Sequence, residues 1–266
     1  MSLRLCLSPN GLINDRRWSL GVNDDLITMR LCPRAVLIQP LIKDNQLILN
    51  APNMEEIKVK TAPFHDYNLR KISINTEDVR DKTTVNIRGK AYVDEGDRVS
   101  VWLSTFLEID NVRLLESIDV HSHAIPVHGA GTKEKGREES ALMITSEGSL
   151  DEVNVRMNID PAGGNEPHSV NMSRFRPSVV VEGPAFIEDF WTRITLNQVT
   201  FTVISNHCHS HNVTVDPLSG LSTGQEPMRT LEGFRRGQED QVWFGRNMIP
   251  EGEGEIRVGD RVMVRR

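Results

Sequence analysis

Short apolar segments separated by turn residues run through the first third of the chain. Asn23-Asp24-Asp25 and Lys43-Asp44-Asn45 stand between such segments. They predict hairpin turns, because Asn and Asp tolerate a positive φ and bond their own backbone. The pattern is typical of a small antiparallel barrel. The apolar segments are residues 19–22, 35–38, 46–49, 57–59 and 85–87.

The spacing of apolar residues becomes helical after Gly96. Val99, Leu103, Phe106 and Leu107 fall on one helical face. They predict one helix of about three turns that follows the barrel.

The second half of the chain alternates short strands with two short helices. Ser149-Leu150-Asp151-Glu152 matches a capping box, which predicts a helix that runs through Asn154. Pro227 suits the first turn of a second helix. Gly259-Asp260 predicts the turn of a closing hairpin between residues 256–258 and 261–264. Strands are predicted over residues 179–181, 194–196, 199–204 and 213–215.

Residues 121–139 separate these two halves. They contain three histidines, several glycines and a charged run, so we expect a loop that connects two modules. The predicted fold is mainly β (α+β), with two β-barrel modules and a few short helices. The first module spans residues 1–120 and the second spans residues 140–266.

Composition narrows the choice of partners. The 266 residues carry a net charge of −6, which argues against nucleic acid, because neutralising phosphates needs a surplus of Lys and Arg. Three widely spaced cysteines predict a reducing compartment without a disulfide framework. No run reaches the roughly 18 apolar residues of a membrane helix, and residues 1–9 lack the core of a signal peptide. We expect a cytoplasmic protein without membrane contact, whose partner is a small molecule or a protein.

The most informative motifs lie between residues 173 and 260. They are Arg174-Phe175-Arg176-Pro177, residues 206–211 (NHCHSH), Val215-Asp216-Pro217 and Val258-Gly259-Asp260. With these motifs the chain resembles the MOSC domain family (molybdenum cofactor sulfurase C-terminal domain), and within it the mitochondrial amidoxime reducing components. The resemblance covers about residue 12 to the C-terminus. It implies an N-terminal MOSC-associated β-barrel, a molybdenum cofactor (Mo-molybdopterin), an N-hydroxylated small-molecule substrate and a separate electron-donor protein.

The resemblance also implies which residues bind the cofactor. Arg16 aligns with a family arginine that contacts the pterin, which a guanidinium can grip with paired hydrogen bonds. Thr145 and Ser146 precede a helix start, where free amides favour an anion, although a plain helix cap is an equally open interpretation. Ser178 replaces a family asparagine. The full set of cofactor-binding candidates is Arg16, Arg30, Thr145, Ser146, Arg174, Arg176, Ser178 and Ser210.

The metal ligand is the open question. The family's metal-binding cysteine aligns with Ser210, and the nearest thiol belongs to Cys208. In a strand, Cys208 and Ser210 would share one face, and His207, His209 and His211 would share the other. Cys208 is the candidate metal ligand, because a thiolate suits molybdenum better than a hydroxyl. Alternatively, the site has lost molybdenum and serves another ligand or reaction, or the three histidines bind a metal or act as catalytic acid and base.

These alternatives lead to three functions. The first is a molybdenum-cofactor oxidoreductase that reduces N-hydroxylated compounds. The second is a cofactor-less MOSC-fold enzyme that tailors or cyclises a small organic molecule in a biosynthetic pathway. It is motivated by the loss of ligand positions, among them a family Lys-Ser pair that residues 3–9 lack. The third is a non-catalytic sulfur-transfer protein that would carry a persulfide on Cys208.

Overall fold

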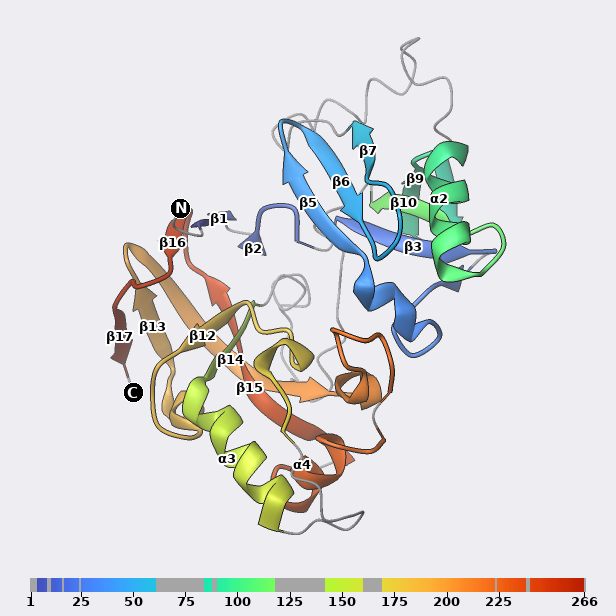
Figure 1. Cartoon of the computed structure of the whole chain (residues 1–266). Coiled ribbons are helices and arrows are strands. Elements are labelled where there is room, and N and C mark those ends of the chain that lie inside the picture. Colours follow the sequence, from blue (N-terminus) through green and yellow to red (C-terminus); the bar gives the residue numbers. More distant parts are fainter. Residues whose placement is uncertain are drawn as a thin grey trace. The chain divides into compact units, whose positions relative to one another are not determined.

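The computed structural model describes residues 4–8, 11–15, 17–23, 25–60, 84–87, 90–117, 142–159, 169–222, 224–237 and 240–265. The chain divides into two compact units (Figure 1). Unit 1 comprises Met1–Asp15, His121–Asp216 and Ser222–Arg266, and unit 2 comprises Arg16–Val120 and Pro217–Leu221. The described residues are mainly β, as the sequence predicts. The loop predicted over residues 121–139 lies outside the described residues.

The described residues of unit 2 form two sheets, one α-helix and one 3-10 turn. One sheet has the strand order β4-β3-β10-β9-β8, and the other has the order β5-β6-β7. The Asp44-Asn45 turn joins β5 to β6 with φ values of 49° and 55°, which confirms the predicted hairpin. The elements are β3 (Trp18–Val22), β4 (Asp25–Leu26), η1 (Pro33–Leu37), β5 (Gln39–Lys43), β6 (Gln46–Asn50), β7 (Ile57–Lys60), β8 (Thr84–Ile87), β9 (Lys90–Asp94), α2 (Asp97–Leu107) and β10 (Arg113–Ser117).

Helix α2 supplies one side of the unit 2 core. Val99, Leu103, Phe106 and Leu107 are all buried, which confirms the predicted helical face. They pack in one cluster with apolar side chains of β6 and β7. Burial of each such side chain stabilises the fold by roughly 1.5–3 kcal/mol.

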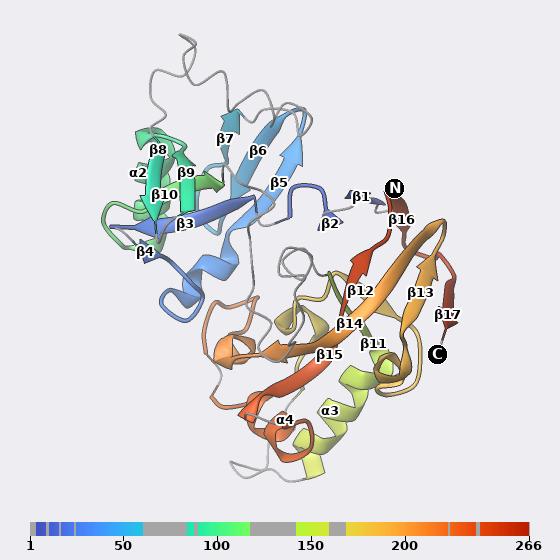
Figure 2. The same cartoon turned by 180° about the vertical axis from the view of Figure 1, so that it is seen from behind.

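Unit 1 is built on a six-stranded sheet with the order β12-β11-β15-β14-β13-β17 (Figure 2). A second sheet, β16-β1-β2, joins the first strand of the chain to one of the last. The elements are β1 (Arg4–Ser8), β2 (Gly11–Leu12), β11 (Leu142–Ser146), α3 (Glu147–Ile159), η4 (Met172–Arg174), β12 (Val179–Val181), η5 (Ile187–Phe190), β13 (Arg193–Leu196), β14 (Val199–His209), η6 (His211–Thr214), α4 (Met228–Phe234), β15 (Val242–Pro250), β16 (Gly254–Arg257) and β17 (Val262–Arg265).

Two predicted strand features of unit 1 are wrong. The closing hairpin does not form, because β16 pairs with β1 whereas β17 pairs with β13. The predicted strand 213–215 falls mostly in the 3-10 turn η6. There Thr214 Oγ1 donates to the carbonyl of His211 over 2.8 Å, a local bond that competes with strand pairing.

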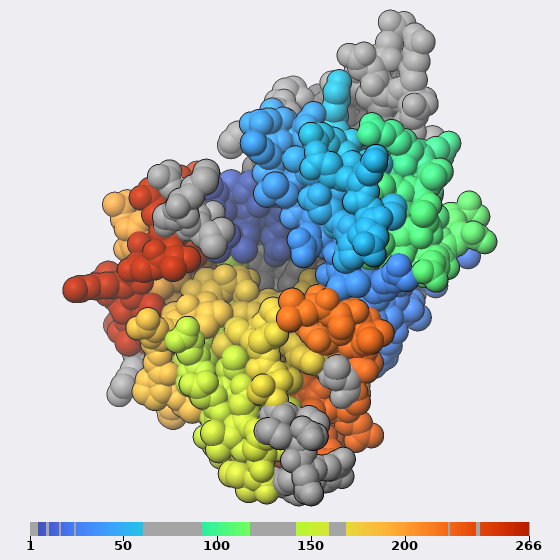
Figure 3. Space-filling model, viewed as in Figure 1, coloured from blue at the N-terminus to red at the C-terminus, as the bar shows by residue number. Residues whose placement is uncertain are grey.

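Helix α3 begins earlier and is longer than the capping box predicts. The hydroxyl of Ser146 accepts a hydrogen bond from the amide of Ser149 over 3.2 Å, so Ser146 caps the helix and Ser149 lies inside it. Figure 3 shows α3 at the surface of unit 1, in agreement with the exposure of Val155 and Ile159. The helix buries Val153 and Met157 against a cluster that also contains residues of α4 and β15.

No helix in the described part of the chain is both long and apolar enough to cross a membrane.

Candidate functional site

The antiparallel ribbon of β14 and β15 carries most of the candidate residues. Its register shifts twice, between Val203 and Ser205 and between Asn206 and Cys208. Paired positions of an antiparallel ribbon present their side chains on the same face, and neighbours along one strand alternate. The register therefore assigns each side chain of the ribbon to one of two faces.

One face, here called the thiol face, carries Asn206, Cys208, Trp243 and Arg246. Asn206 is paired with Arg246, and Cys208 is paired with Trp243. Arg246 Nη1 donates to Asn206 Oδ1 over 2.7 Å, and the Cys208 thiol donates to Gln241 Oε1 over 3.1 Å. Cys208 is exposed, yet partial burial of the sulfur raises the pKa of its thiol.

The thiol face also carries two N–H groups that have no acceptor in the described residues, one on Arg246 and one on Trp243. Among the described residues, neither Arg246 Nε nor Trp243 Nε1 has a hydrogen-bond partner, and both atoms are buried. Burial lowers the pKa of Arg246 more than the neighbouring carboxylates raise it. This face thus combines a thiol with N–H donors.

The opposite face, here called the histidine face, carries Ser205, His207, His209 and Asn247. Asn247 Nδ2 donates to Ser205 Oγ over 3.0 Å and to the carbonyl of Asn206 over 3.2 Å. Because a carbonyl only accepts, these contacts fix the orientation of the amide. Asn247 Oδ1 therefore accepts from His207 Nδ1–H over 2.6 Å, and neutral His207 carries its proton on Nδ1.

His209 is held in the opposite tautomer. Its Nε2–H donates to the carbonyl of Phe244 over 3.0 Å, and its ring meets Phe175 edge to face with the centroids 5.4 Å apart. Burial of the ring, and then the neighbouring His207, lower the pKa of His209 to about 3. His209 is therefore neutral near pH 7 and does not act as a proton donor there.

Strand β14 ends at His209, which corrects the predicted arrangement of three histidines on one strand. Ser210 adopts an extended backbone and caps η6, accepting a hydrogen bond from the amide of Asn212 over 3.5 Å. His211 begins η6 and is exposed. His207 and His209 do lie together, with ring centroids 4.7 Å apart, and His211 is not in a strand with them.

The Arg-Phe-Arg-Pro motif lies against this end of β14. Arg174 is buried and donates from Nη1 to the carbonyl of Thr214 in η6 over 2.9 Å. Burial lowers the pKa of Arg174, and Asp216 acts in the opposite direction. Arg176 is exposed, with φ at 55°. The Ser178 hydroxyl accepts a hydrogen bond from the amide of Met143 over 3.3 Å.

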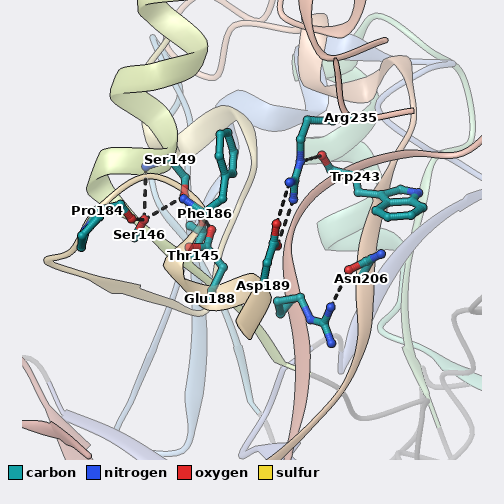
Figure 4. A network of polar contacts seen from close by, with 11 residues as sticks. Thr145, Ser146, Ser149, Pro184, Phe186, Glu188, Asp189, Asn206, Arg235 and Trp243 are labelled. Carbon is teal, nitrogen blue, oxygen red and sulfur yellow. Dashed lines mark hydrogen bonds and ion pairs between the residues drawn. The ribbon is translucent and has the colours of Figure 1, made fainter. Parts of the chain in front are cut away.

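Thr145 and Ser146 belong to a buried polar network around Glu188 (Figure 4). Glu188 Oε1 accepts from Thr145 Oγ1 over 3.0 Å and from Ser149 Oγ over 2.7 Å. Ser146 Oγ donates to the carbonyl of Pro184 over 2.9 Å. The network joins β11, α3 and η5, so these hydroxyls are engaged inside the protein.

The remaining candidates lie in unit 2 or outside the described residues. Arg16 is not among the described residues, and Arg30 is an exposed residue of unit 2. The neighbouring Arg17 is buried and ion-paired with Glu116 over 2.6 Å. Within the described ranges, no group of three or more His, Cys, Asp or Glu side chains could hold a metal ion. The alternative in which the three histidines bind a metal therefore has no support among the described residues.

Sequence reasoning assigned no role to Trp243, Arg246 or Asn247. The only available signal was a pair of polar residues, Arg246 and Asn247, inside an otherwise apolar strand. Their roles depend on the bulged register of β14 and β15, which the sequence pattern does not show.

The thiol face fits the chemistry of a molybdenum cofactor. Cys208 offers the soft donor that this metal favours, and a coordinating thiol is deprotonated even when its pKa is raised. Arg176 is exposed and can hold an anionic group, but its neighbour Phe175 packs against His209 of the histidine face. The hydroxyls of Thr145, Ser146 and Ser178 contribute little to the fit, because each already has a partner within the protein.

Comparisons with known proteins match both halves of the chain. The MOSC N-terminal beta barrel domain matches residues 3–110, and the MOSC domain matches residues 131–263. Mitochondrial amidoxime-reducing component 1 of Danio rerio is 29% identical over 264 residues, which cover 95% of this chain and 74% of the relative. Component 2 of Bos taurus is 28% identical over 268 residues, with 95% and 74% covered. A solution structure of a Bordetella bronchiseptica protein is 18% identical, with a TM-score of 0.29 over 42% of this chain and 84% of the other.

Proposed function

The chain belongs to the MOSC domain family, and on this premise we propose that it is a molybdenum-cofactor oxidoreductase that reduces N-hydroxylated small molecules. The similar proteins are named as amidoxime-reducing components, which supports a reduction of this kind. The observation that carries the proposal is the exposed thiol of Cys208 at the end of β14. We place the enzyme in the cytoplasm, with electrons supplied by a separate redox protein.

The chain's own residues have distinct tasks in this proposal. When bound, the molybdenum cofactor supplies the two-electron redox chemistry. Cys208 provides the protein thiolate, and loss of its proton ends the hydrogen bond to Gln241. Arg176 holds an anionic group of the cofactor with its exposed guanidinium. Arg174, tied to Thr214, fixes η6 beside the motif that contains Arg176.

Metal content tests this proposal directly. The full chain is produced in a host that synthesises the cofactor, and molybdenum is measured by elemental analysis together with the fluorescent pterin released on denaturation. We expect near-stoichiometric molybdenum in the wild type, its loss in Cys208→Ala and its retention in Cys6→Ala. Cys6 is the matched control because it is the other exposed thiol of unit 1 in the described residues.

A second variant tests whether a thiol at the family's ligand position can bind the metal. Ser210→Cys in the Cys208→Ala background returns a thiol to that position, and we expect it to restore part of the molybdenum. Wild-type protein with molybdenum far below stoichiometry and no pterin would overturn the proposal. Full metal content in Cys208→Ala would show that Cys208 is not the ligand.

The histidine face supports a second candidate, a cofactor-less enzyme that uses acid–base chemistry on a small molecule. The observation in its favour is the fixed tautomer of His207, which Asn247 holds with the proton on Nδ1. A fixed tautomer is how proteins prepare a histidine for proton transfer. Under this candidate, turnover is lost in His207→Gln and persists in Cys208→Ala. Under the molybdenum proposal, turnover is lost in Cys208→Ala and persists in His207→Gln.

A further inference from the structure

We propose that Arg246 and Trp243 bind an anionic oxygen group, a carboxylate or a phosphate, of the substrate on the thiol face. The inference rests on the proposed function, because it names the substrate class of the same site.

Arg246 has an unused hydrogen-bonding edge. Its Nη1 donates to the neutral amide of Asn206, while its buried Nε–H has no partner among the residues that the structure describes. Arg235 offers a comparison in the same unit, because it grips Asp189 with two bonds of 2.6 and 3.0 Å. Carboxylates and phosphates bind guanidinium groups with two parallel bonds of this kind. Arg235 uses both terminal nitrogens for its carboxylate, whereas Arg246 keeps its Nε–H available for an acceptor.

In the described residues no neighbouring carboxylate forms an ion pair with Arg246, although Oε2 of Glu188 is itself buried without a hydrogen-bond partner. Asp189 raises the pKa of Arg246, but Asp189 is already bound to Arg235. The positive charge of Arg235 lowers the pKa of Arg246. Like Asp189, Glu188 raises the pKa of Arg246, yet one of its oxygens already accepts two hydroxyl bonds. Burial lowers the pKa of Arg246 by more than the two carboxylates raise it. A guanidinium that is desolvated and not directly paired is unfavourable, and a bound anion would relieve that penalty.

Trp243 carries a second N–H donor on the same face of the ribbon. Its Nε1–H is buried and, in the described part of the chain, lacks an acceptor. Its position is paired with Cys208, so the anion donors share the face of the thiol. Indole and guanidinium N–H groups are donors only, so the group they select is an acceptor. An ionised oxygen group forms shorter and stronger bonds with them than a neutral carbonyl does.

The negative net charge of the chain means that an anionic substrate has to be attracted by donors close to its binding site. With a net charge of −6, the average field of the protein repels anions. Both N–H groups are also buried, so an anion that reaches them meets donors in a low dielectric. Selectivity for an anion therefore comes from these two residues.

Indole resonances give a direct test that does not depend on the cofactor. The full-length protein labelled with nitrogen-15 is titrated with benzoate, with inorganic phosphate and with benzamide, the neutral isostere of benzoate. Trp243→Phe assigns the Trp243 indole signal. We expect this signal to shift saturably with benzoate, phosphate or both, and to stay in place with benzamide. A response to benzoate alone identifies a carboxylate site, and a response to phosphate alone identifies a phosphate site.

Variants of Arg246 separate binding from folding. Arg246→Gln should weaken the anion affinity at least tenfold, Arg246→Lys should lie between it and the wild type, and Arg257→Gln should match the wild type. Arg257 is the control because it is an exposed arginine of unit 1 in an ion pair. Thermal unfolding should show a loss of no more than about 1 kcal/mol in Arg246→Gln, because the lost hydrogen bond to Asn206 is offset by removal of a partly desolvated charge.

Three results would overturn the inference. They are an indole signal that no anion moves, equal responses to benzoate and benzamide, and equal anion affinities in Arg246→Gln and the wild type. A loss of stability well above about 1 kcal/mol in Arg246→Gln would assign the residue to structure instead. Molybdenum content is measured separately, so failure of the anion site and failure of the proposed function are distinguishable.

Discussion

Replacing Ser149 by Ala should destabilise unit 1 by about 2–3 kcal/mol. The Ser149 hydroxyl donates to the buried carboxylate of Glu188 over 2.7 Å and accepts from the amide of Phe186 over 2.8 Å. A hydrogen bond to a charged group contributes roughly 1.5–3 kcal/mol and a neutral one about 1 kcal/mol. The higher helix propensity of Ala returns about 0.5 kcal/mol, because Ser149 lies inside α3.

The assay is thermal unfolding of the full chain followed by tryptophan fluorescence, to which the buried Trp191 contributes for unit 1. For a domain of this size the expected loss corresponds to a melting temperature lower by roughly 5–10 °C. Ser173→Ala is the matched control, because Ser173 is exposed in the same unit and should shift by less than about 0.5 kcal/mol. If Ser149→Ala is no less stable than Ser173→Ala, the network around Glu188 does not hold β11, α3 and η5 together.

Two further predictions concern the β14–β15 ribbon. A Cβ on Gly237 would lie 1.7 Å from the ring of Trp243, so Gly237→Ala should destabilise unit 1 by roughly 1–3 kcal/mol and shift the Trp243 indole resonance; an unchanged resonance would contradict this packing. His209 has a pKa of about 3 in the folded state, so below about pH 6.5 the unfolded state takes up the proton first. Stability should then fall with decreasing pH by up to ~1.4 kcal/mol per unit, and His209→Gln should flatten this slope in denaturant titrations; equal slopes in both proteins would refute it.

Local features of the fold were predictable from the sequence. The Asp44-Asn45 hairpin depends on two residues that tolerate a positive φ, and α2 depends on apolar positions within three turns. The Gly259-Asp260 turn is also real, since the amide of Arg257 donates to Asp260 Oδ2 over 2.7 Å. The hairpin around it fails because β16 and β17 join different sheets. Pairing between distant segments is set by the whole core, which a local pattern does not contain.

In the candidate site, too, features set by neighbouring residues were predictable and features set by distant pairing were not. Alternation along one strand correctly placed His207 and His209 together and Cys208 apart from them. The end of the strand at His209 was not predictable, because Ser210 satisfies the next turn with its own hydroxyl. Arg246 could not be placed beside Asn206 either, since the bulged register decides which face each residue takes.

The two faces of the ribbon give the two candidate functions separate structural bases. Cys208 and Arg246 project from one face, and His207 and Asn247 project from the other. A reaction that needs the thiolate and an anionic substrate therefore uses the thiol face, and acid–base chemistry at His207 uses the opposite one. Side chains on opposite faces of the ribbon point away from each other, so the effects of substituting them should be nearly additive. Strong coupling between Cys208→Ala and His207→Gln in substrate turnover would show instead that one pocket reaches both faces.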